Sequence, residues 1–595
     1  MLVLSTVSMQ AQTGTPARTT TKKVVKKKAE TPLERTLREL REQMQSQQAQ
    51  IDELKRQLAD RDARLTTASQ DAQAANASAA AAASQAQNAL TAIQSNHEEM
   101  QTLSSSVSDL KVANTGLAQT ISDTKKDINT AMESPTTIHY KGVTITPVAF
   151  FAFETVWRQR AMNSDVNTPF NTTPYMGAGE ANTSEFNFSG RQSRVGGLFE
   201  GNTGPFKLAG YVEADFLSAG ATSNENQSNS YTLRQRQIWG QLATQKGFTL
   251  TGGQMWSLVT ETKKSTDNRA ENLPMTVDAQ YHVGFSWARQ AAIRFQQRVG
   301  TGFTIAGSLE EGQTLYSATN ANQNFFIGSA GSGGGLYNVT ANYSNDIAPD
   351  LILKGTYDGK AGHYEIGGVG RWFRSRYYPG QTNVVPTAAG GQNDTKTGGG
   401  FFANARFPVK KYVDFGFHVM GGTGVGRYGT STLPDVTVHP DGTLAPIKSW
   451  QGLYSMEFHP APKWDVFGYA GAEYAQRTVY LSTLGSSAGK LIGYAPQTAL
   501  NTGCDTETLP TSAGNGLAGG PPYNPGTPAN CLGATRVVIE GTAGFTYRFY
   551  NSPKYGRLQY SGVYSYLVRN AWTGVGGAPS ANNNMIFTGM RYYIP

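Results

Sequence analysis

The stretch 536–549 alternates apolar and polar side chains along the chain. Successive side chains of a β-strand point to opposite faces, so this stretch predicts a strand with one apolar, aromatic face and one charged face. The apolar positions are Val537, Ile539, Ala543, Phe545, Tyr547 and Phe549, and the polar positions are Arg536, Glu540, Thr542, Thr546 and Arg548. A soluble sandwich could supply one such strand. The recurrence of the pattern across 138–595 predicts a transmembrane β-barrel instead.

The stretches 206–216, 413–420 and 557–569 repeat the alternation. In the first of them we expect Val212 to face lipid and Glu213 to face the lumen. Between such stretches, short turns alternate with long polar loops, as in outer-membrane barrels. We therefore expect an all-β transmembrane barrel of about sixteen antiparallel strands, with both of its ends on the short-turn, periplasmic side.

The composition fits a barrel better than a helical membrane protein. The mean hydropathy is −0.40, and no run of about 18 apolar residues exists, which argues against transmembrane helices. Glycine (66), tyrosine (28) and phenylalanine (26) are abundant. The formal charge of +8 is no sign of a nucleic-acid partner, because lysine is concentrated in an N-terminal tail rather than in a domain.

The first 31 residues divide into two short segments. Residues 1–12 resemble the remnant of a secretory signal peptide, with a short apolar run and Ala11 before a cleavage point. Residues 13–31 form a basic tail that contains five lysines, Lys22, Lys23, Lys26, Lys27 and Lys28. Such a tail is either solvated and disordered, or it makes an electrostatic contact with an anionic surface such as cell-wall polymer or inner-membrane lipid.

Residues 32–134 carry an unbroken heptad repeat that predicts a long α-helical coiled coil before the barrel. At a rise of 1.5 Å per residue, about 100 residues make a rod of roughly 150 Å. Ile121 and Ile128 at position a, with Leu110 and Leu117 at position d, favour two strands. Because the barrel begins on the periplasmic side, we expect the stalk in the periplasm.

Two cysteines, Cys504 and Cys531, lie close together in a segment rich in glycine, proline and asparagine. In an exported protein they would form one loop disulfide, and two free thiols are the alternative. The seven histidines show no metal-ligand spacing, and no catalytic set of Ser, His and Asp stands out. We therefore expect no enzyme activity, no cofactor and no metal.

Several arginine-containing motifs, together with the stalk, resemble the DcaP-type trimeric porins of Gram-negative outer membranes. The matching segments are 189–194, 233–237, 253–257, 289–290 with Arg294, and 349–350 followed by 362–364. The resemblance covers most of 32–595, although the loops differ. It implies a sixteen-stranded monomer, a homotrimer held by coiled coil and barrel, outer-membrane lipid and lipopolysaccharide as neighbours, and uptake of small anionic solutes such as dicarboxylates. The implied trimer conflicts with the two-stranded preference of the heptads.

Arginines form the candidate pore site. They are Arg191, Arg194, Arg234, Arg236, Arg289 and Arg294 in the first half of the barrel, and Arg371, Arg374 and Arg376 on a later strand. Guanidinium groups are costly in lipid, so most should face the lumen or lie near the rims. There they would favour anions, and their planar geometry suits carboxylates. Alternatively, they pair with Glu154, Glu185, Glu213 and Asp215 and merely fill a polar wall.

Two positional details follow from this interpretation. Arg191 and Arg194 are three residues apart, so they cannot share a face without a bulge or a rim position. Gln235 and Gln237 should face outward beside Trp239, which fits a contact between subunits better than lipid.

The polar loop 259–280 is a candidate constriction. It contains Glu261, Lys263, Lys264, Asp267, Arg269 and Glu271. We expect it to fold into the lumen, since loops often occupy barrel interiors, and a surface loop is the alternative.

Together these features predict an outer-membrane porin for passive diffusion of small hydrophilic, anionic solutes, with its stalk in the periplasm. The alternative function is a structural tether, in which the stalk reaches the cell wall and the barrel is its anchor.

Overall fold

The computed structural model divides the chain into two compact units, residues 1–128 and 129–595. It describes residues 137–217, 233–328, 344–379, 388–507, 528 and 530–595. In the first unit it describes only Lys111, Asn114, Leu117, Thr120 and Ile121, all helical. The predicted signal remnant, basic tail and most of the predicted stalk lie outside the described residues.

None of the helical segments in the described part of the chain is long and apolar enough to span a bilayer.

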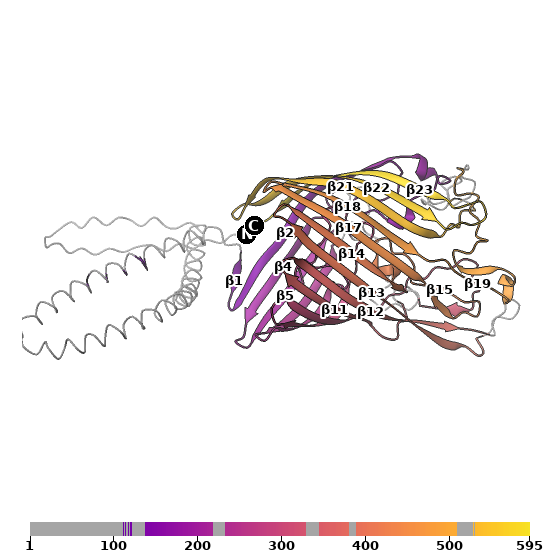
Figure 1. Ribbon diagram of the computed structural model, residues 1–595, viewed down its shortest axis with the longest axis horizontal. Coiled ribbons are helices and arrows are strands. Elements are labelled where there is room, and N and C mark those ends of the chain that lie inside the picture. Colours follow the sequence, from indigo (N-terminus) through magenta and orange to yellow (C-terminus); the bar gives the residue numbers. More distant parts are fainter. Residues whose placement is uncertain are drawn as a thin grey trace, which may run out of the picture. The chain divides into compact units, whose positions relative to one another are not determined.

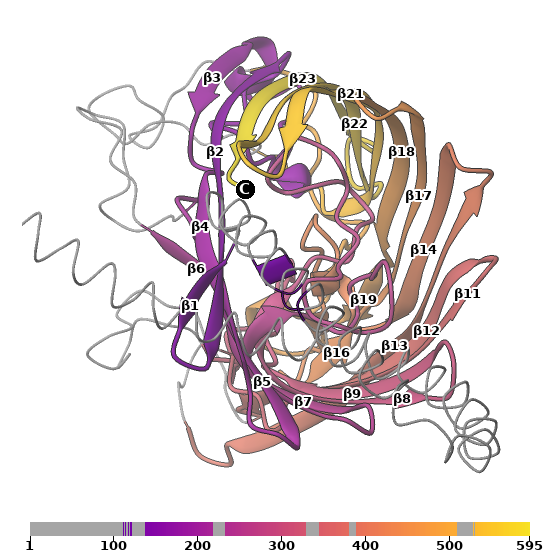
Figure 2. The same ribbon diagram turned by 90° about the vertical axis from the view of Figure 1, so that its left-hand side faces the viewer.

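The second unit is a closed barrel of antiparallel strands (Figures 1 and 2). Its wall contains sixteen strands: β2 (Val143–Arg158), β4 (Arg194–Asn202), β5 (Phe206–Asp215), β6 (Arg234–Thr244), β7 (Phe248–Trp256), β8 (Arg289–Val299), β9 (Phe303–Glu310), β11 (Asp350–Gly359), β12 (Gly362–Tyr377), β13 (Gln392–Val409), β14 (Val413–Thr423), β17 (Lys448–Ala461), β18 (Trp464–Ala475), β21 (Thr535–Ser552), β22 (Gly556–Ala571) and β23 (Ser580–Tyr593). The last strand pairs with β2, Thr588 opposite Thr155, and so closes the ring. The predicted strand number and antiparallel order are confirmed.

Shorter elements extend or decorate this wall. The hairpin strand β1 (Ile138–Tyr140) pairs with the start of β2, and β3 (Glu185–Ser189) continues the line of β4 along the other part of β2. The remaining short elements are β10 (Phe325–Phe326), β15 (Val436–Val438), β16 (Leu444–Pro446), β19 (Thr478–Leu481), β20 (Leu491–Tyr494), and the 3₁₀ turns η1 (Phe170–Thr172), η2 (Gly179–Asn182), η3 (Gly426–Tyr428) and η4 (Gly485–Ser487).

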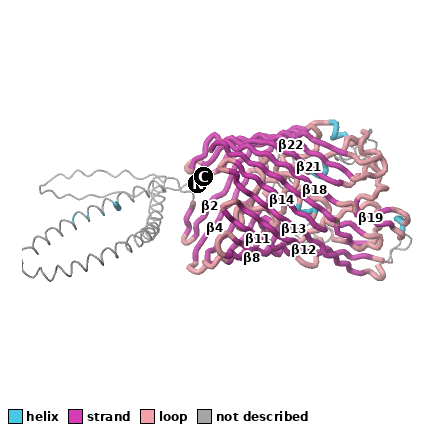
Figure 3. The backbone as a smooth tube through the Cα atoms, viewed as in Figure 1, coloured by secondary structure: helices cyan, strands magenta, loops and turns pink. Residues whose placement is uncertain are grey.

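The connections alternate in length, as the sequence predicts. Turns of three residues join β4 to β5, β8 to β9 and β21 to β22, and they lie at the end of the barrel where β2 begins. The long connections lie at the other end, drawn in pink at the right of Figure 3. One of them is closed by a disulfide between Cys504 and Cys531, which confirms the predicted pair.

Exposure along the strands follows the predicted alternation. On β5, Val212 is 39% exposed on the outer face, whereas Glu213 and Asp215 are buried on the inner face. On β2, Phe151 and Phe153 are exposed and Glu154 is fully buried. A belt of apolar and aromatic side chains therefore surrounds a wall whose inner face carries charge, which is the arrangement of a transmembrane barrel.

Two β-bulges shift this alternation and correct two predictions. A bulge at Arg236 leaves that residue without a partner on β5, so Gln235 points outward, but Gln237 and Trp239 are buried rather than outward. A bulge at Arg536 interrupts the pairing of β21 with β22, and Arg536 is exposed instead of facing the lumen. A bulge inserts one extra residue into the strand, so the side chains on its two sides no longer follow one alternation. The period-two pattern of the sequence cannot locate such an insertion.

The loop between β7 and β8, residues 257–288, lies inside the barrel. Its backbone N–H groups donate to side chains across the ring: Thr262 to Glu365 of β12 (2.8 Å), Met275 to Tyr469 of β18 (3.0 Å), Val283 to Glu540 of β21 (2.9 Å) and Gly284 to Glu473 of β18 (2.8 Å). Apolar residues of this loop pack with Phe170, Phe467 and Phe587 in one buried cluster. The loop thus crosses the lumen and is attached to the far wall.

Candidate functional site

The inner faces of β5 and β6 form a compact ion-pair network. Arg236 is 2% exposed, and its guanidinium donates to Glu213 (Nε to Oε1, 2.6 Å) and to Asp215 (Nη1 to Oδ2, 2.6 Å). Arg234 donates to both oxygens of Asp215 at 2.9 Å. Residues two apart share one face of a strand, so Arg234 and Arg236 both reach Asp215.

The predicted conflict between Arg191 and Arg194 is resolved by a break in the strand. Residues 190–193 separate β3 from β4, and both strands pair with β2. Arg194 begins β4 and lies 3.7 Å from Glu213, while Arg191 lies in the break and binds Asp165 of the loop 159–184 at 2.9 Å. Both arginines therefore reach the inner side.

Arg289, the first residue of β8, differs from these arginines. Among the described residues, no carboxylate lies within ion-pair distance of it, and its Nε and Nη1 atoms are buried without a hydrogen-bond acceptor. Its guanidinium carbon lies 5.0 Å from the ring centroids of both Trp256 and Trp287. Stacking on aromatic faces compensates part of the cost of burying this charge, but it leaves these N–H groups without an acceptor.

Arg289 belongs to the same electrostatic cluster as the ion-pair network. The pKa of the Tyr281 hydroxyl, in the inner loop, reflects the positive charge of these arginines. Burial alone would raise the pKa of its hydroxyl, but the guanidinium groups of Arg236, Arg194 and Arg289 outweigh burial and lower that pKa below its usual value. Arg236 Nη2 lies 3.3 Å from the Tyr281 oxygen.

We name the set Arg194, Arg234, Arg236 and Arg289 the arginine cluster. Its described carboxylate partners are Glu213 and Asp215, so its positive charges outnumber its negative ones.

The remaining predicted arginines are bound by other groups or face elsewhere. Arg294 is buried, and its guanidinium donates to Asn268 Oδ1 (2.8 Å) and to backbone carbonyls. Arg371 is 1% exposed between Asp350 (3.0 Å) and Asp435 (2.7 Å). Arg374, which we predicted to face the lumen, and Arg376 lie instead on the outward positions of β12, because they are three and five residues from Arg371 and an unbroken strand turns odd spacings to the other face.

The six predicted charged residues of the inner loop have different environments. Glu261 is buried and accepts a hydrogen bond from Asn272 (2.9 Å). Asp267 binds Arg298 of the wall (2.7 Å). Glu271 pairs with the backbone of Thr262 in an isolated β-bridge. The other three, Lys263, Lys264 and Arg269, are exposed.

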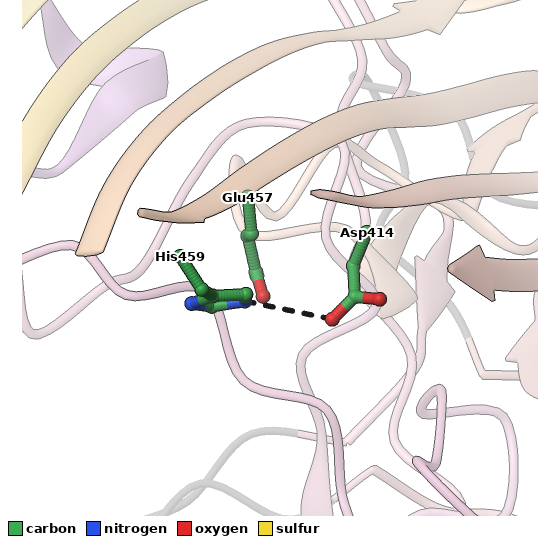
Figure 4. A group of neighbouring side chains, drawn as sticks. All are labelled: Asp414, Glu457 and His459. Carbon is green, nitrogen blue, oxygen red and sulfur yellow. Dashed lines mark ion pairs between the residues drawn. The ribbon is translucent and has the colours of Figure 1, made fainter. Parts of the chain in front are cut away.

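A further group of polar side chains lies near the short-turn end of the barrel. Asp414, Glu457 and His459 come from β14 and β17 and place their potential ligand atoms within 4.8 Å of one another (Figure 4). Arg406 of β13 already forms ion pairs with Asp414 (3.3 Å) and Glu457. Its guanidinium supplies the positive charge that these carboxylates need, so the group is better explained as an ion-pair network than as a metal site.

Two further inward-facing charges were not among the predicted pore residues. Lys354 of β11 is fully buried and binds Glu365 at 2.7 Å, and Arg158 of β2 is fully buried and binds Glu185 at 2.7 Å. The pairing of Arg158 with Glu185, and of Arg591 with Glu154 at 2.7 Å, shows that these two glutamates do not neutralise the arginine cluster. The alternation along β2 places Arg158 on the same, inward face as Glu154.

Comparisons with known proteins agree with this architecture. The chain matches no protein-family profile, and no curated protein sequence matches it. Among solved structures, the outer membrane channel DcaP of Acinetobacter baumannii is similar with a TM-score of 0.50 and 14% identity, covering 77% of this chain and 99% of that one. The chain has a DcaP-like porin fold.

Other barrels are more distant from this DcaP-like chain. The anion-selective porin from Comamonas acidovorans has a TM-score of 0.38 and 9% identity, covering 76% of this chain and 100% of that one. OmpT of Vibrio cholerae has a TM-score of 0.39 and 10% identity, covering 77% and 99%. The match to DcaP at a TM-score of 0.50 confirms the predicted resemblance to DcaP-type porins for the fold.

Proposed function

We propose that this protein is an outer-membrane porin through which small hydrophilic solutes diffuse passively, with a preference for anions such as dicarboxylates. The closed barrel, its apolar outer belt and its charged inner face support a membrane channel. The DcaP-like fold supports the outer membrane as its location.

The observation that carries the anion preference is Arg289. Within the arginine cluster, its guanidinium has buried N–H groups that lack an acceptor. A carboxylate could accept two parallel hydrogen bonds from such a group, which a cation could not. The fixed positive charge of Arg194, Arg234 and Arg236 around it lowers the barrier for an anion and raises it for a cation.

We also propose that the loop 257–288 acts as the constriction. Its attachments to β12, β18 and β21 span the lumen, and Lys263, Lys264 and Arg269 are its exposed charges. These side chains would place positive charge in the remaining water-filled path, in agreement with the anion preference.

We further propose that the protein assembles as a homotrimer through the outer face of β6 and β7. Gln235 donates to Gln254 (3.2 Å) on this face, where single amides would be poorly satisfied in lipid. Gly210, Gly240 and Gly252 lie in register on three adjacent strands of the same region, so backbones of two barrels could approach closely there. The rest of the outer belt would face lipid and lipopolysaccharide.

The test is the reversal potential of the purified protein in a planar bilayer under a KCl gradient. Wild type should prefer chloride, and Arg289→Gln should reduce the chloride-to-potassium permeability ratio several-fold, because it removes the charge with buried, unpaired donors. Arg298→Gln is the matched control, since Arg298 is exposed and paired with Asp267. A cation-selective wild type, or equal ratios in wild type and Arg289→Gln, would contradict the anion site.

A further inference from the structure

A cavity of about 320 Å³ lies among the long loops, at the end of the barrel opposite the short turns. Its lining comes from four of these connections, from the start of β21 and from the end of β22. The polar and aromatic side chains on it are Asn171, Tyr316, Ser317, Thr432, Tyr494 and Arg569. If the protein is the porin proposed above, this cavity is at the extracellular mouth of the channel. No residue of the arginine cluster lines it.

Arg569 provides the only described cationic group on this lining. It is held in place by hydrogen bonds from Nε to Thr535 Oγ1 (2.9 Å) and from Nη1 to the Thr173 carbonyl (2.9 Å), and Tyr175 stacks on it at 4.5 Å. Among the described residues no carboxylate lies within ion-pair distance of it, and nothing accepts from its Nη2 group. A fixed guanidinium with one available edge suits one anionic group.

No described residue of the lining is acidic. The nearest carboxylate along the chain, Asp435, adjoins the lining residue Pro434 but is already engaged: it binds Arg371 at 2.7 Å and accepts the backbone N–H groups of Leu315 (2.9 Å) and Arg427 (3.0 Å). Arg569 is therefore the one described charged group on the lining of the cavity.

The other lining groups are suited to hydroxyl groups rather than to a second charge. Asn171 Oδ1 accepts from Thr535 (2.6 Å), and its amide nitrogen has no acceptor in the described part of the chain. Ser317 and Thr432 contribute hydroxyls, and Tyr316 and Tyr494 contribute rings. Aromatic rings with neutral donors and acceptors recognise hydroxylated carbon skeletons, and a cavity near the lower end of ligand-site volumes limits the ligand to a small molecule.

We propose that this cavity is an outer binding site for a small polyhydroxylated monocarboxylate of the size of a six-carbon sugar acid. The carboxylate binds Arg569, and the hydroxyls bind Asn171, Ser317 and Thr432. The inference rests on the porin function for its role in transport, because a ligand held at this mouth would be concentrated at the start of the channel. The binding itself does not depend on the inner arginine cluster.

The test uses the full-length protein in detergent, with glucuronate as the probe and saturation-transfer NMR as the readout. Glucuronate should bind to wild type, whereas glucose should bind at least tenfold more weakly because it lacks the charge. Arg569→Gln should weaken glucuronate binding by about tenfold to a hundredfold, the usual effect of losing a charge-assisted hydrogen bond. Ser317→Ala removes one hydroxyl for which the structure shows no side-chain hydrogen bond, and it should weaken binding of glucuronate more than that of succinate.

Arg536→Gln is the matched control. Arg536 of β21 lies at the same end of the barrel as Arg569 of β22, but its side chain is exposed outside the lumen. It removes the same charge and should leave glucuronate binding unchanged. Arg569→Lys, which keeps the charge, checks that loss of binding is not loss of folding, and it should retain part of the affinity.

The outcomes separate this inference from the porin function. Absence of glucuronate binding to wild type, equal binding to Arg569→Gln, or equal loss in Arg536→Gln would overturn the site. Succinate binding as tightly as glucuronate, with the same dependence on Arg569, would overturn the assignment of a hydroxylated ligand. Binding that depends on Arg569 in a protein that conducts no ions would support the site while contradicting the porin function.

Discussion

Replacing Gly471 with alanine should push the inner loop away from the barrel wall. Gly471 lies on the inward face of β18, where a Cβ atom would lie 1.8 Å from the carbonyl oxygen of Val283. Since real Cβ contacts are essentially never closer than 3.0 Å, the oxygen would have to retreat by about 1.2 Å in a close-packed interior.

That displacement is larger than the neighbouring hydrogen bonds can accommodate. The N–H groups of Val283 and Gly284 donate to Glu540 at 2.9 Å and to Glu473 at 2.8 Å. A shift of about 1 Å would take both beyond the usual limit for a hydrogen bond. A hydrogen bond contributes about 0.5–1.5 kcal/mol net, so losing two would weaken the attachment by about 1–3 kcal/mol.

Single-channel recording in a planar bilayer measures the effect. If the loop narrows the channel, Gly471→Ala should give a larger and noisier open level than wild type. Gly541→Ala on the adjacent strand is the control, because a Cβ atom there would meet no atom within 4 Å, and it should conduct as wild type does. A correctly folded Gly471→Ala protein with unchanged conductance and noise would refute the constriction.

Three further predictions concern charge, pH and the disulfide. Arg236→Met should destabilise the barrel by about 3–5 kcal/mol, because it leaves buried carboxylates without their partner, and the addition of Glu213→Gln should recover part of this loss in urea-induced unfolding. Burial, followed by repulsion from other carboxylates, raises the pKa of Glu261 to about 8. This loop carboxyl is therefore neutral at pH 6 and charged at pH 9.5. The chloride preference should fall between these pH values in wild type and should not change with pH in Glu261→Gln. Cys504→Ser removes a link to Cys531 across 27 positions and should lower stability by about 3.5 kcal/mol on the chain-entropy model, measured by thermal unfolding with and without reductant.

The sequence was sufficient for the wall because its information is local. Period-two alternation gave the inward facing of Glu213 and the outward facing of Val212, and it also gave the strand number. The prediction failed where one extra residue changed the phase, at Arg236 and Arg536. It also failed at Arg374, where the odd spacing from Arg371 should have placed the two on opposite faces.

The interior of the barrel was less accessible to sequence reasoning. The inner loop could be proposed from its charges, but its attachments join residues 257 positions apart in the case of Val283 and Glu540. No local pattern encodes such a contact. Likewise, the unpaired state of Arg289 depends on which carboxylates the fold brings near, and that is known only once all strands have been placed.

The pairing of β2 with β23 has a consequence for biogenesis. Glu154 and Arg591, which bridge this seam with a buried ion pair, are 437 positions apart in the chain. Until these strands meet, each has an edge of unpaired N–H and C=O groups, and hydrocarbon offers no water to solvate them at several kcal/mol per group. Contacts between such distant residues form slowly. A polypeptide arrested before its final strand would therefore keep two unpaired strand edges, and it should not persist as a smaller closed barrel.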